Sequence, residues 1–288
     1  MHARPVRPHR QRHHNPITDG NLSPPAQQHS EAFQQHIRTE SEQMRVGVYI
    51  DGLNLYYGGR SIMGRGQPGW RWLDLRKLSQ RLVDGSQSWL ARGATLHRIV
   101  YCTAFIAGSY NAQGRRNQDR YIAALRHHGS FDLLEKGRFV SRLKTAPLAT
   151  KGPGGKPTLA TSAWPVMVRD ALGNDVPDAV FIASHQHWEE KSTDVNVASH
   201  LLLDVAGGTV DAAVVISNDS DLRLPIRESR LRVPVGMVNP SSGQLAGDLR
   251  GEAGSGAGGH WWYQLKGADF LACQLPDPVG TLAKPAGW

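Results

Sequence analysis

Cysteine is scarce in this sequence, with only Cys102 and Cys273 among 288 residues. The two do not form a C-x-x-C pair, which argues against both a disulfide framework and a structural zinc site. Long apolar runs are missing as well. No stretch approaches the roughly 18 apolar residues of a membrane span, and the N-terminal stretch has no apolar core like that of a signal peptide. We therefore expect a cytoplasmic protein with no membrane partner.

Acidic residues are outnumbered by basic ones. The chain has 25 Asp and Glu against 33 Lys and Arg, a formal net charge of +8 and a pI of about 9.7. Such a balance favours anionic partners, nucleic acid above all, but it describes association and not fold.

Residues 1–43 contain almost no aliphatic side chains and are rich in His, Pro, Gln and Arg. A segment of this composition offers too little apolar surface to offset the entropy lost on ordering. We expect a disordered N-terminal extension followed by one folded domain at residues 44–288. The extension holds six of the 13 histidines, so it is either a solvated tail without function or an adventitious metal binder.

Apolar runs and amphipathic stretches alternate along the folded part. Apolar runs predict strands, and apolar residues at helical spacing predict helices. The order predicts an α/β fold with a mainly parallel sheet. A Gly, Pro, Lys and Thr rich segment at 144–164 reads as part of a loop-rich insertion around 144–188. The expected strands are 44–50, 95–106, 136–143, 178–184, 211–217 and 233–240, and the expected helices are 72–83, 117–128 and 192–208.

Carboxylates follow two of these apolar runs directly. Asp51 ends the run in "VYIDGLNLYYG", and Asp219 and Asp221 follow the run in "VVISNDSDLRLP". Because ligands gather at the carboxyl ends of parallel strands, these residues are expected on one rim if their strands are neighbours. Asp194, in "WEEKSTDVNVA", falls in the first turn of a predicted helix, where the helix dipole favours a carboxylate. Each also has a plainer reading, as a turn cap, a helix-dipole partner or a polar loop.

Four carboxylates on one rim would repel one another unless a hard cation lies between them. Mg²⁺ or Mn²⁺ is the ion that matches oxygen ligands of this kind. We therefore expect a metal site whose ligands are Asp51, Asp194, Asp219 and Asp221.

Three motifs, in order, resemble those of the NYN family, the LabA-like branch of the PIN-like nuclease fold. They are "YIDGLNLYY", "EEKSTDVNVASHLLLDV" and "DAAVVISNDSDLRLPI". The resemblance runs from Met44 to the end of the chain and is poor at 144–188. It implies a PIN-like or Rossmann-like three-layer fold and a metal-dependent ribonuclease. The catalytic residues it implies are Asp51, Asn54, Asp194, Asp219 and Asp221.

An RNA substrate would need contacts beyond the carboxylates. We expect these from Ser217, Asn218, Lys191, Arg60 and Arg116, with a metal ion activating the attacking water. Two other functions stay open. One is a non-catalytic RNA-binding or regulatory module on the same basic surface. The other is an enzyme that acts on a small molecule in the same rim pocket, which the long insertion and the eight tryptophans permit.

Overall fold

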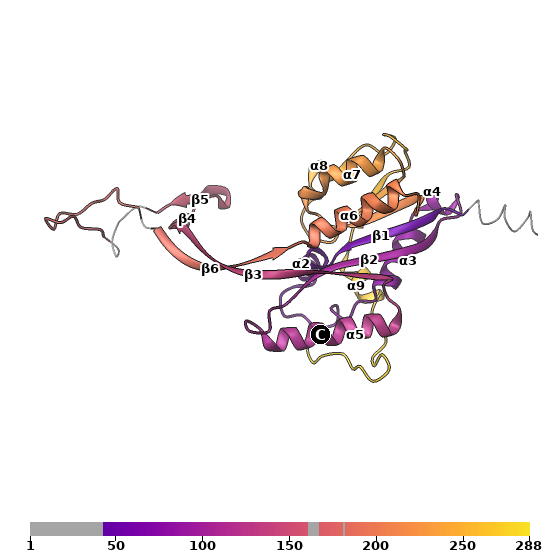
Figure 1. Ribbon diagram of the computed structural model, residues 1–288, viewed down its shortest axis with the longest axis horizontal. Coiled ribbons are helices and arrows are strands. Elements are labelled where there is room, and N and C mark those ends of the chain that lie inside the picture. The colour runs from indigo at the N-terminus through magenta and orange to yellow at the C-terminus, as the bar shows by residue number, and fades with distance from the viewer. Residues whose placement is uncertain (1–42, 161–166, 181) are drawn as a thin grey trace, which may run out of the picture. The chain divides into compact units, whose positions relative to one another are not determined.

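A seven-stranded sheet, in the order β6-β3-β2-β1-β7-β8-β9, forms the centre of the folded domain (Figure 1). The structure, a computed structural model, describes residues 43–160, 167–180 and 182–288. All neighbouring strands are parallel except β3 and β6. The strands are β1 (Arg45–Asp51), β2 (Thr95–Phe105), β3 (Leu133–Pro147), β6 (Ile182–Lys191), β7 (Ala212–Ile216), β8 (Val235–Asn239) and β9 (Trp261–Gln264).

Helices cover both faces of this sheet, so the predicted three-layer α/β fold with a mainly parallel sheet is confirmed (Figure 1). Strand β1 shows why two cores form, because its side chains alternate between the faces. Val46, Val48 and Ile50 enter one core, and Tyr49 enters the other. The first core lies under α2 (Gly52–Met63), α3 (Leu75–Asp84), α4 (Gln87–Leu90), α5 (Ala112–His128) and α9 (Gly267–Ala272); the second lies under α6 (Thr193–Ala206), α7 (Arg223–Arg230) and α8 (Gly247–Arg250).

The predicted N-terminal extension, 1–43, lies outside the described residues except for Gln43. The folded body begins at Met44, which is buried in the first core. Among the described residues, no helix has both the length and the apolar content that crossing a membrane requires.

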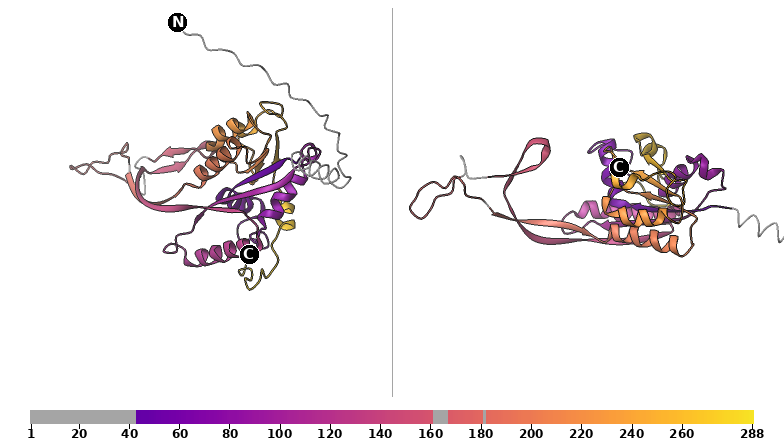
Figure 2. Two further views of the ribbon diagram at one scale, coloured as in Figure 1. Left: turned by 45° about the vertical axis from the view of Figure 1, so that its right-hand side comes forward. Right: turned by 90° about the horizontal axis from the view of Figure 1, so that it is seen from above.

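The loop-rich insertion expected around 144–188 is in large part a hairpin arm. Strand β3 continues to Pro147, well past the predicted end at 143, and pairs antiparallel with β6 from Arg138↔Lys191 to Pro147↔Ile182. Figure 2 shows this two-stranded ribbon projecting beyond the helices. The strand expected at 178–184 instead begins at Ile182 and ends at Lys191. The predicted bounds were wrong because they followed the apolar run at 178–184. Strand β6 itself is largely solvent-exposed, so its sequence has no apolar pattern that marks where it begins and ends. A small second sheet joins β4 (Ala149–Lys151) and β5 (Pro157–Leu159).

Helix α2 was not expected, because its Asp-Gly start and paired glycines favour a turn. Its glycines allow close packing instead. A Cβ on Gly58 would lie 2.4 Å from the carbonyl oxygen of Pro240, and a Cβ on Gly59 would lie 2.8 Å from the rings of Trp70 and Phe270. Helix α2 thus packs directly on the end of β8 and brings its first turn to the rim of the sheet.

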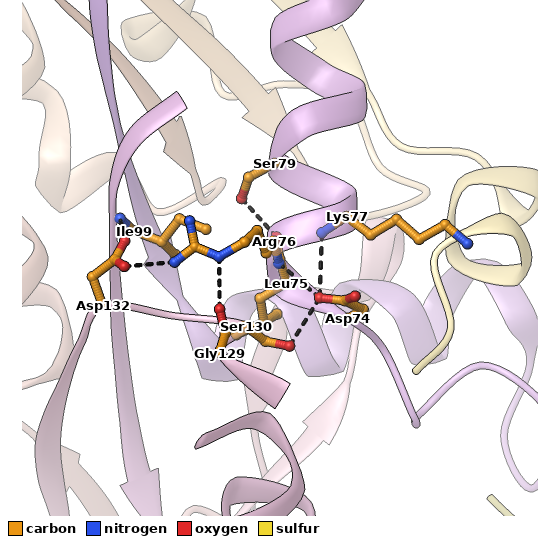
Figure 3. A network of polar contacts seen from close by, with 9 residues as sticks. All are labelled: Asp74, Leu75, Arg76, Lys77, Ser79, Ile99, Gly129, Ser130 and Asp132. Carbon is orange, nitrogen blue, oxygen red and sulfur yellow. Dashed lines mark hydrogen bonds and ion pairs between the residues drawn. The ribbon is translucent and has the colours of Figure 1, made fainter. Parts of the chain in front are cut away.

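A polar network fixes the start of α3 (Figure 3). Asp74 is the N-cap, and its Oδ1 accepts from the backbone N–H groups of Arg76 and Lys77 and from the Ser130 hydroxyl. Arg76 in turn donates to Gly129 O and to Asp132, whose other oxygen accepts from the N–H of Ile99. The network therefore ties α3 to the turn after α5 and to β2.

We expect Asp74→Ala to lower the free energy of unfolding by about 1–3 kcal/mol, because it removes an N-cap and leaves the buried Ser130 hydroxyl without its acceptor. Urea denaturation of the two proteins measures this. Asp84→Ala is the matched control, since Asp84 is an exposed residue at the other end of the same helix. Equal losses for both variants would contradict the role assigned to Asp74.

Candidate active site at the carboxyl rim of the sheet

The ends of β1 and β7 lie side by side, because Ile50 is paired with Ile216 in a parallel ladder. The residues that follow are therefore held together by hydrogen bonds. The Ser217 hydroxyl donates to Asp51 Oδ2 at 3.2 Å, and the backbone N–H of Asn218 donates to Asn54 Oδ1 at 3.0 Å. This juxtaposition is the one that the sequence predicts for the two carboxylate-bearing strand ends.

A pocket of about 630 Å³, here called the rim pocket, opens at this point. Four carboxylates from three parts of the chain line it: Asp51, Glu190, Asp194 and Asp219. Six predicted site residues are brought together here, and Glu190 joins them although the motifs did not single it out. The other lining residues are Leu53, Asn54, Tyr57, Gly58, Ser61, Lys191, Ser192, Thr193, Val195, Asn218 and Ser241.

Asp51 is the most buried carboxylate of the rim pocket, with 5% of its surface exposed. It is also the N-cap of α2, since its Oδ1 accepts from the N–H of Asn54 at 3.0 Å. Burial raises the pKa of Asp51 from 3.8 to about 6, against the hydrogen bonds from Asn54 and Ser217, and the charges of Asp219 and Glu190 raise it further. A carboxylic acid with a pKa close to neutrality can exchange a proton at physiological pH.

The raised pKa predicts a pH-dependent stability. Because the folded protein binds this proton more tightly than the unfolded chain, the contribution is full below about pH 4 and is lost as the pH rises through 6. The loss corresponds to about 3 kcal/mol. Asp51→Asn removes the charge and keeps a good cap. Melting curves with chelator should show the melting temperature of the variant rising relative to that of the wild type between pH 4 and 6.5. A difference in melting temperature that does not change with pH would contradict the assignment.

The segment before α6 places the second group of polar residues. Ser192 has a left-handed backbone with φ of 85°, which is unusual for a residue other than glycine. Glu190 accepts from the N–H and the hydroxyl of Thr193, which fixes its carboxylate at the pocket wall. Lys191 lies on the pocket but pairs with Glu189 at 2.9 Å. Hydrogen bonds from Lys144 and Lys191 lower the pKa of Glu189 to about 2.

Four predicted site residues do not line the rim pocket. Ser217 lies behind it, where it is buried and bonded to Asp51. Asp221 is exposed and meets Asp219 only through its own backbone N–H, which donates to Asp219 Oδ1. Arg60 lies in the last turn of α2, away from the Asp51 end. Arg116 lies on α5, where it contacts Gln113.

Asn218 does line the rim pocket, but its side-chain amide is already engaged. Its Nδ2 donates to Gln244 O, and its Oδ1 accepts from the N–H of Ala246.

The carboxylates surround the pocket without converging on a point. In the ranges that the structure describes, no group of three or more His, Cys, Asp or Glu side chains is arranged to hold a metal ion. Both oxygens of Asp51 already accept hydrogen bonds from the chain. The predicted Mg²⁺ or Mn²⁺ site thus stays a prediction.

A second cavity, here called the aromatic cavity, has a volume of about 300 Å³ and shares Leu53 and Tyr57 with the rim pocket. Motif reasoning missed it because its residues come from segments far apart in the sequence. The adjacent aromatics in "NLYYGG" and "GWRW" were the available signal. Its aromatic lining consists of Tyr56, Tyr57, Trp70, Tyr101, Tyr121, Phe139, Phe270 and Trp288, and its polar lining includes Arg71, Thr103, Asn111, Asn117 and Gln118.

No family model matches the chain. The chain is, however, 30% identical over 274 residues to 6-hydroxy-3-succinoylpyridine 3-monooxygenase HspA of Pseudomonas putida (strain DSM 28022 / S16). That match covers 87% of this chain and 77% of the relative. The chain belongs to the family of this monooxygenase. Among solved structures it is similar to a protein of unknown function from Vibrio parahaemolyticus RIMD 2210633, with 13% identity and a TM-score of 0.38, over 78% of this chain and 94% of that one.

Membership of the HspA family corrects the expected activity. The ribonuclease function, and with it the nuclease and hydrolase class, is wrong, because the curated relative is a monooxygenase. The prediction came from motifs that resemble those of a nuclease fold, and it failed because one fold and one ligand-binding rim can carry unrelated chemistries. The NYN resemblance and the RNA partner stay predictions. Of the two alternatives, an enzyme acting on a small molecule agrees with the relative.

Proposed function

We propose that this chain is a monooxygenase that adds one oxygen atom of O₂ to a small aromatic molecule. The observation that carries the proposal is the similarity to HspA, which covers 87% of the chain. In such a reaction the substrate gains one oxygen atom, and the other leaves as water. The balance requires two electrons and two protons, so a two-electron donor such as a reduced nicotinamide or flavin must take part.

The aromatic cavity supports the proposal because its size and lining suit one aromatic ring. Small-molecule sites are mostly apolar, with a few placed polar groups, and about 300 Å³ is at the lower end of their range. Trp70 and Phe270 meet edge to face with ring centroids 6.0 Å apart, which holds the wall rigid. A ring in this cavity would reach the rim pocket at the two shared residues, Leu53 and Tyr57.

Asp51 is the residue we assign to proton transfer. It lies in the rim pocket, and burial is the main cause that raises its pKa to about 6. At neutral pH the group is therefore mostly an ionised carboxylate, with a pKa close enough to the pH for it to accept a proton from a substrate. An aromatic ring with a hydroxyl group becomes more electron-rich when that hydroxyl is deprotonated. We assign to Asp51 the removal of this proton, and to Asn54 and Asp219 the positioning of polar groups at the same pocket.

The proposal is tested by turnover of 6-hydroxy-3-succinoylpyridine by the purified full-length chain. The assay follows O₂ consumption and substrate loss with reduced nicotinamide, with reduced flavin and with both. We expect O₂ uptake that depends on the substrate and exceeds the uptake with donor alone. O₂ uptake unaffected by this and related hydroxypyridines with every donor would contradict the proposal.

A further inference from the structure

The guanidinium of Arg71 is the polar group of the aromatic cavity that the fold leaves least satisfied. Its Nη1 donates to Gly287 O at 3.2 Å. Its Nε is buried and has no hydrogen-bond partner among the described residues. Among the described residues, no carboxylate forms an ion pair with Arg71. Its Nη2 makes no hydrogen bond among the described residues either and is not enclosed, so it is a charged donor that an acceptor from outside the chain can reach.

The geometry of the unused donors defines the acceptor. Nη1 is bound to Gly287 O and Nε is enclosed by the chain, so Nη2 is the donor left for a ligand, and a carboxylate oxygen is the acceptor that pairs most strongly with such a charged N–H. The guanidinium carbon lies 5.4 Å from the centroid of the Trp70 ring, a contact that holds the guanidinium in place. Arg71 is therefore positioned before any ligand arrives.

The surroundings of Arg71 define the rest of the ligand. Tyr56, Trp70 and Phe270 line the same cavity, and Tyr56 packs on Trp70 with ring centroids 5.6 Å apart. Gln118 also lines it, but both atoms of its amide are held by the backbone at Ala104 and Ile106. Arg71 is thus a positively charged group in a mainly aromatic enclosure of about 300 Å³.

We propose that the aromatic cavity binds a single-ring aromatic acid, with its carboxylate on Nη2 of Arg71 and its ring among Tyr56, Trp70 and Phe270. That this acid is the molecule oxidised at the rim rests on the proposed function. The binding itself does not. The name of the relative's substrate, 6-hydroxy-3-succinoylpyridine, describes a molecule of this class, because a succinoyl group ends in a carboxylate.

The test compares the binding of acids with that of their methyl esters, by calorimetry and by quenching of tryptophan fluorescence. The probes are 6-hydroxy-3-succinoylpyridine and its phenyl analogue, which carries the same acid chain on a benzene ring. We expect wild type to bind each acid roughly 10- to 100-fold more tightly than its ester, the range for hydrogen bonds to a charged group. Arg71→Gln should lose this preference and keep the affinity for the esters.

Two further variants make the result specific. Arg65→Gln removes a positive charge from an exposed residue of the same loop and should leave every affinity unchanged. Arg71→Lys keeps the charge without the planar guanidinium that Gly287 and Trp70 hold in place, and it should recover only part of the preference. Melting curves confirm that each variant is folded. Equal affinity of wild type for acids and esters, no binding of either acid, or an unchanged preference in a folded Arg71→Gln variant would overturn the proposal. Binding without turnover would contradict the proposed function and leave this inference standing.

Discussion

Asp51→Asn is expected to lower kcat for oxidation of 6-hydroxy-3-succinoylpyridine by 100- to 10,000-fold, the range in which a positioned general base contributes. The amide cannot accept the proton, but its oxygen can still accept from the N–H of Asn54, and its NH₂ group, in the place of Oδ2, can donate to the Ser217 hydroxyl oxygen. The substrate should therefore bind with nearly unchanged affinity. Removing a buried charge should also make the variant more stable than wild type at neutral pH, so a loss of activity would accompany a gain in stability.

The control for this prediction is Asp221→Asn. Asp221 is one of the carboxylates predicted from the sequence as a site residue, but it is exposed and does not line the rim pocket. We expect its kcat to stay within a factor of three of the wild-type value. Stopped-flow binding and steady-state kinetics, measured on both variants, separate affinity from turnover. A fully active Asp51→Asn variant would remove Asp51 from the chemistry.

Trp72→Ala is expected to lower the free energy of unfolding by about 3–5 kcal/mol, the cost of removing a large side chain from a packed core. Trp72 has 0% exposed surface, and its Nε1 donates to Pro276 O at 2.8 Å. Its ring centroid lies 5.8 Å from that of Tyr121 and 6.4 Å from that of Trp288. Both neighbours line the aromatic cavity, so the variant should also bind aromatic acids more weakly.

Trp262→Ala is the matched control, because Trp262 is 46% exposed. It should change stability by no more than about 0.5 kcal/mol, as is usual at the surface. Guanidinium denaturation of both variants gives the comparison. Trp72 contacts the C-terminal segment through Pro276 and Trp288. A loss of less than about 1 kcal/mol in the free energy of unfolding of Trp72→Ala would contradict the view that these contacts anchor that segment.

Much of the fold could be predicted from the apolar runs. The runs at 44–50, 95–106 and 211–217 became β1, β2 and β7, since a strand buried on both faces is apolar throughout. Helix α2 could not be predicted in the same way. Gly58 and Gly59 have low helix propensity, so they predict no helix here. Only the tertiary structure shows why glycine is needed, because Pro240, Trp70 and Phe270 lie too close for a side chain. The strand expected at 136–143 lies within β3, but the full length of the β3–β6 arm and its antiparallel pairing were not predicted, because the arm is maintained by its strand pairing and not by apolar burial.

The candidate site was partly predictable for a similar reason. Asp51 and Asp219 follow strands, so the rule about strand ends was enough to place them together. That rule gives position and not chemistry, and the nuclease chemistry was taken from the motif resemblance. The aromatic cavity combines Trp70, Tyr121 and Trp288, which lie far apart in the chain and share no motif. The unused Nη2 donor of Arg71 could be recognised only from the hydrogen bonds and the burial of the other two nitrogens.

The most direct test of the assignment as a monooxygenase is the source of the oxygen atom in the product. The full-length protein is incubated with 6-hydroxy-3-succinoylpyridine and a two-electron donor, once with heavy-isotope O₂ in ordinary water and once with ordinary O₂ in heavy-isotope water. Mass spectrometry of the product should show one labelled oxygen atom in the first reaction and no newly introduced label in the second, after correction for exchange of the carbonyl oxygen. A product that takes its new oxygen from water would contradict the account.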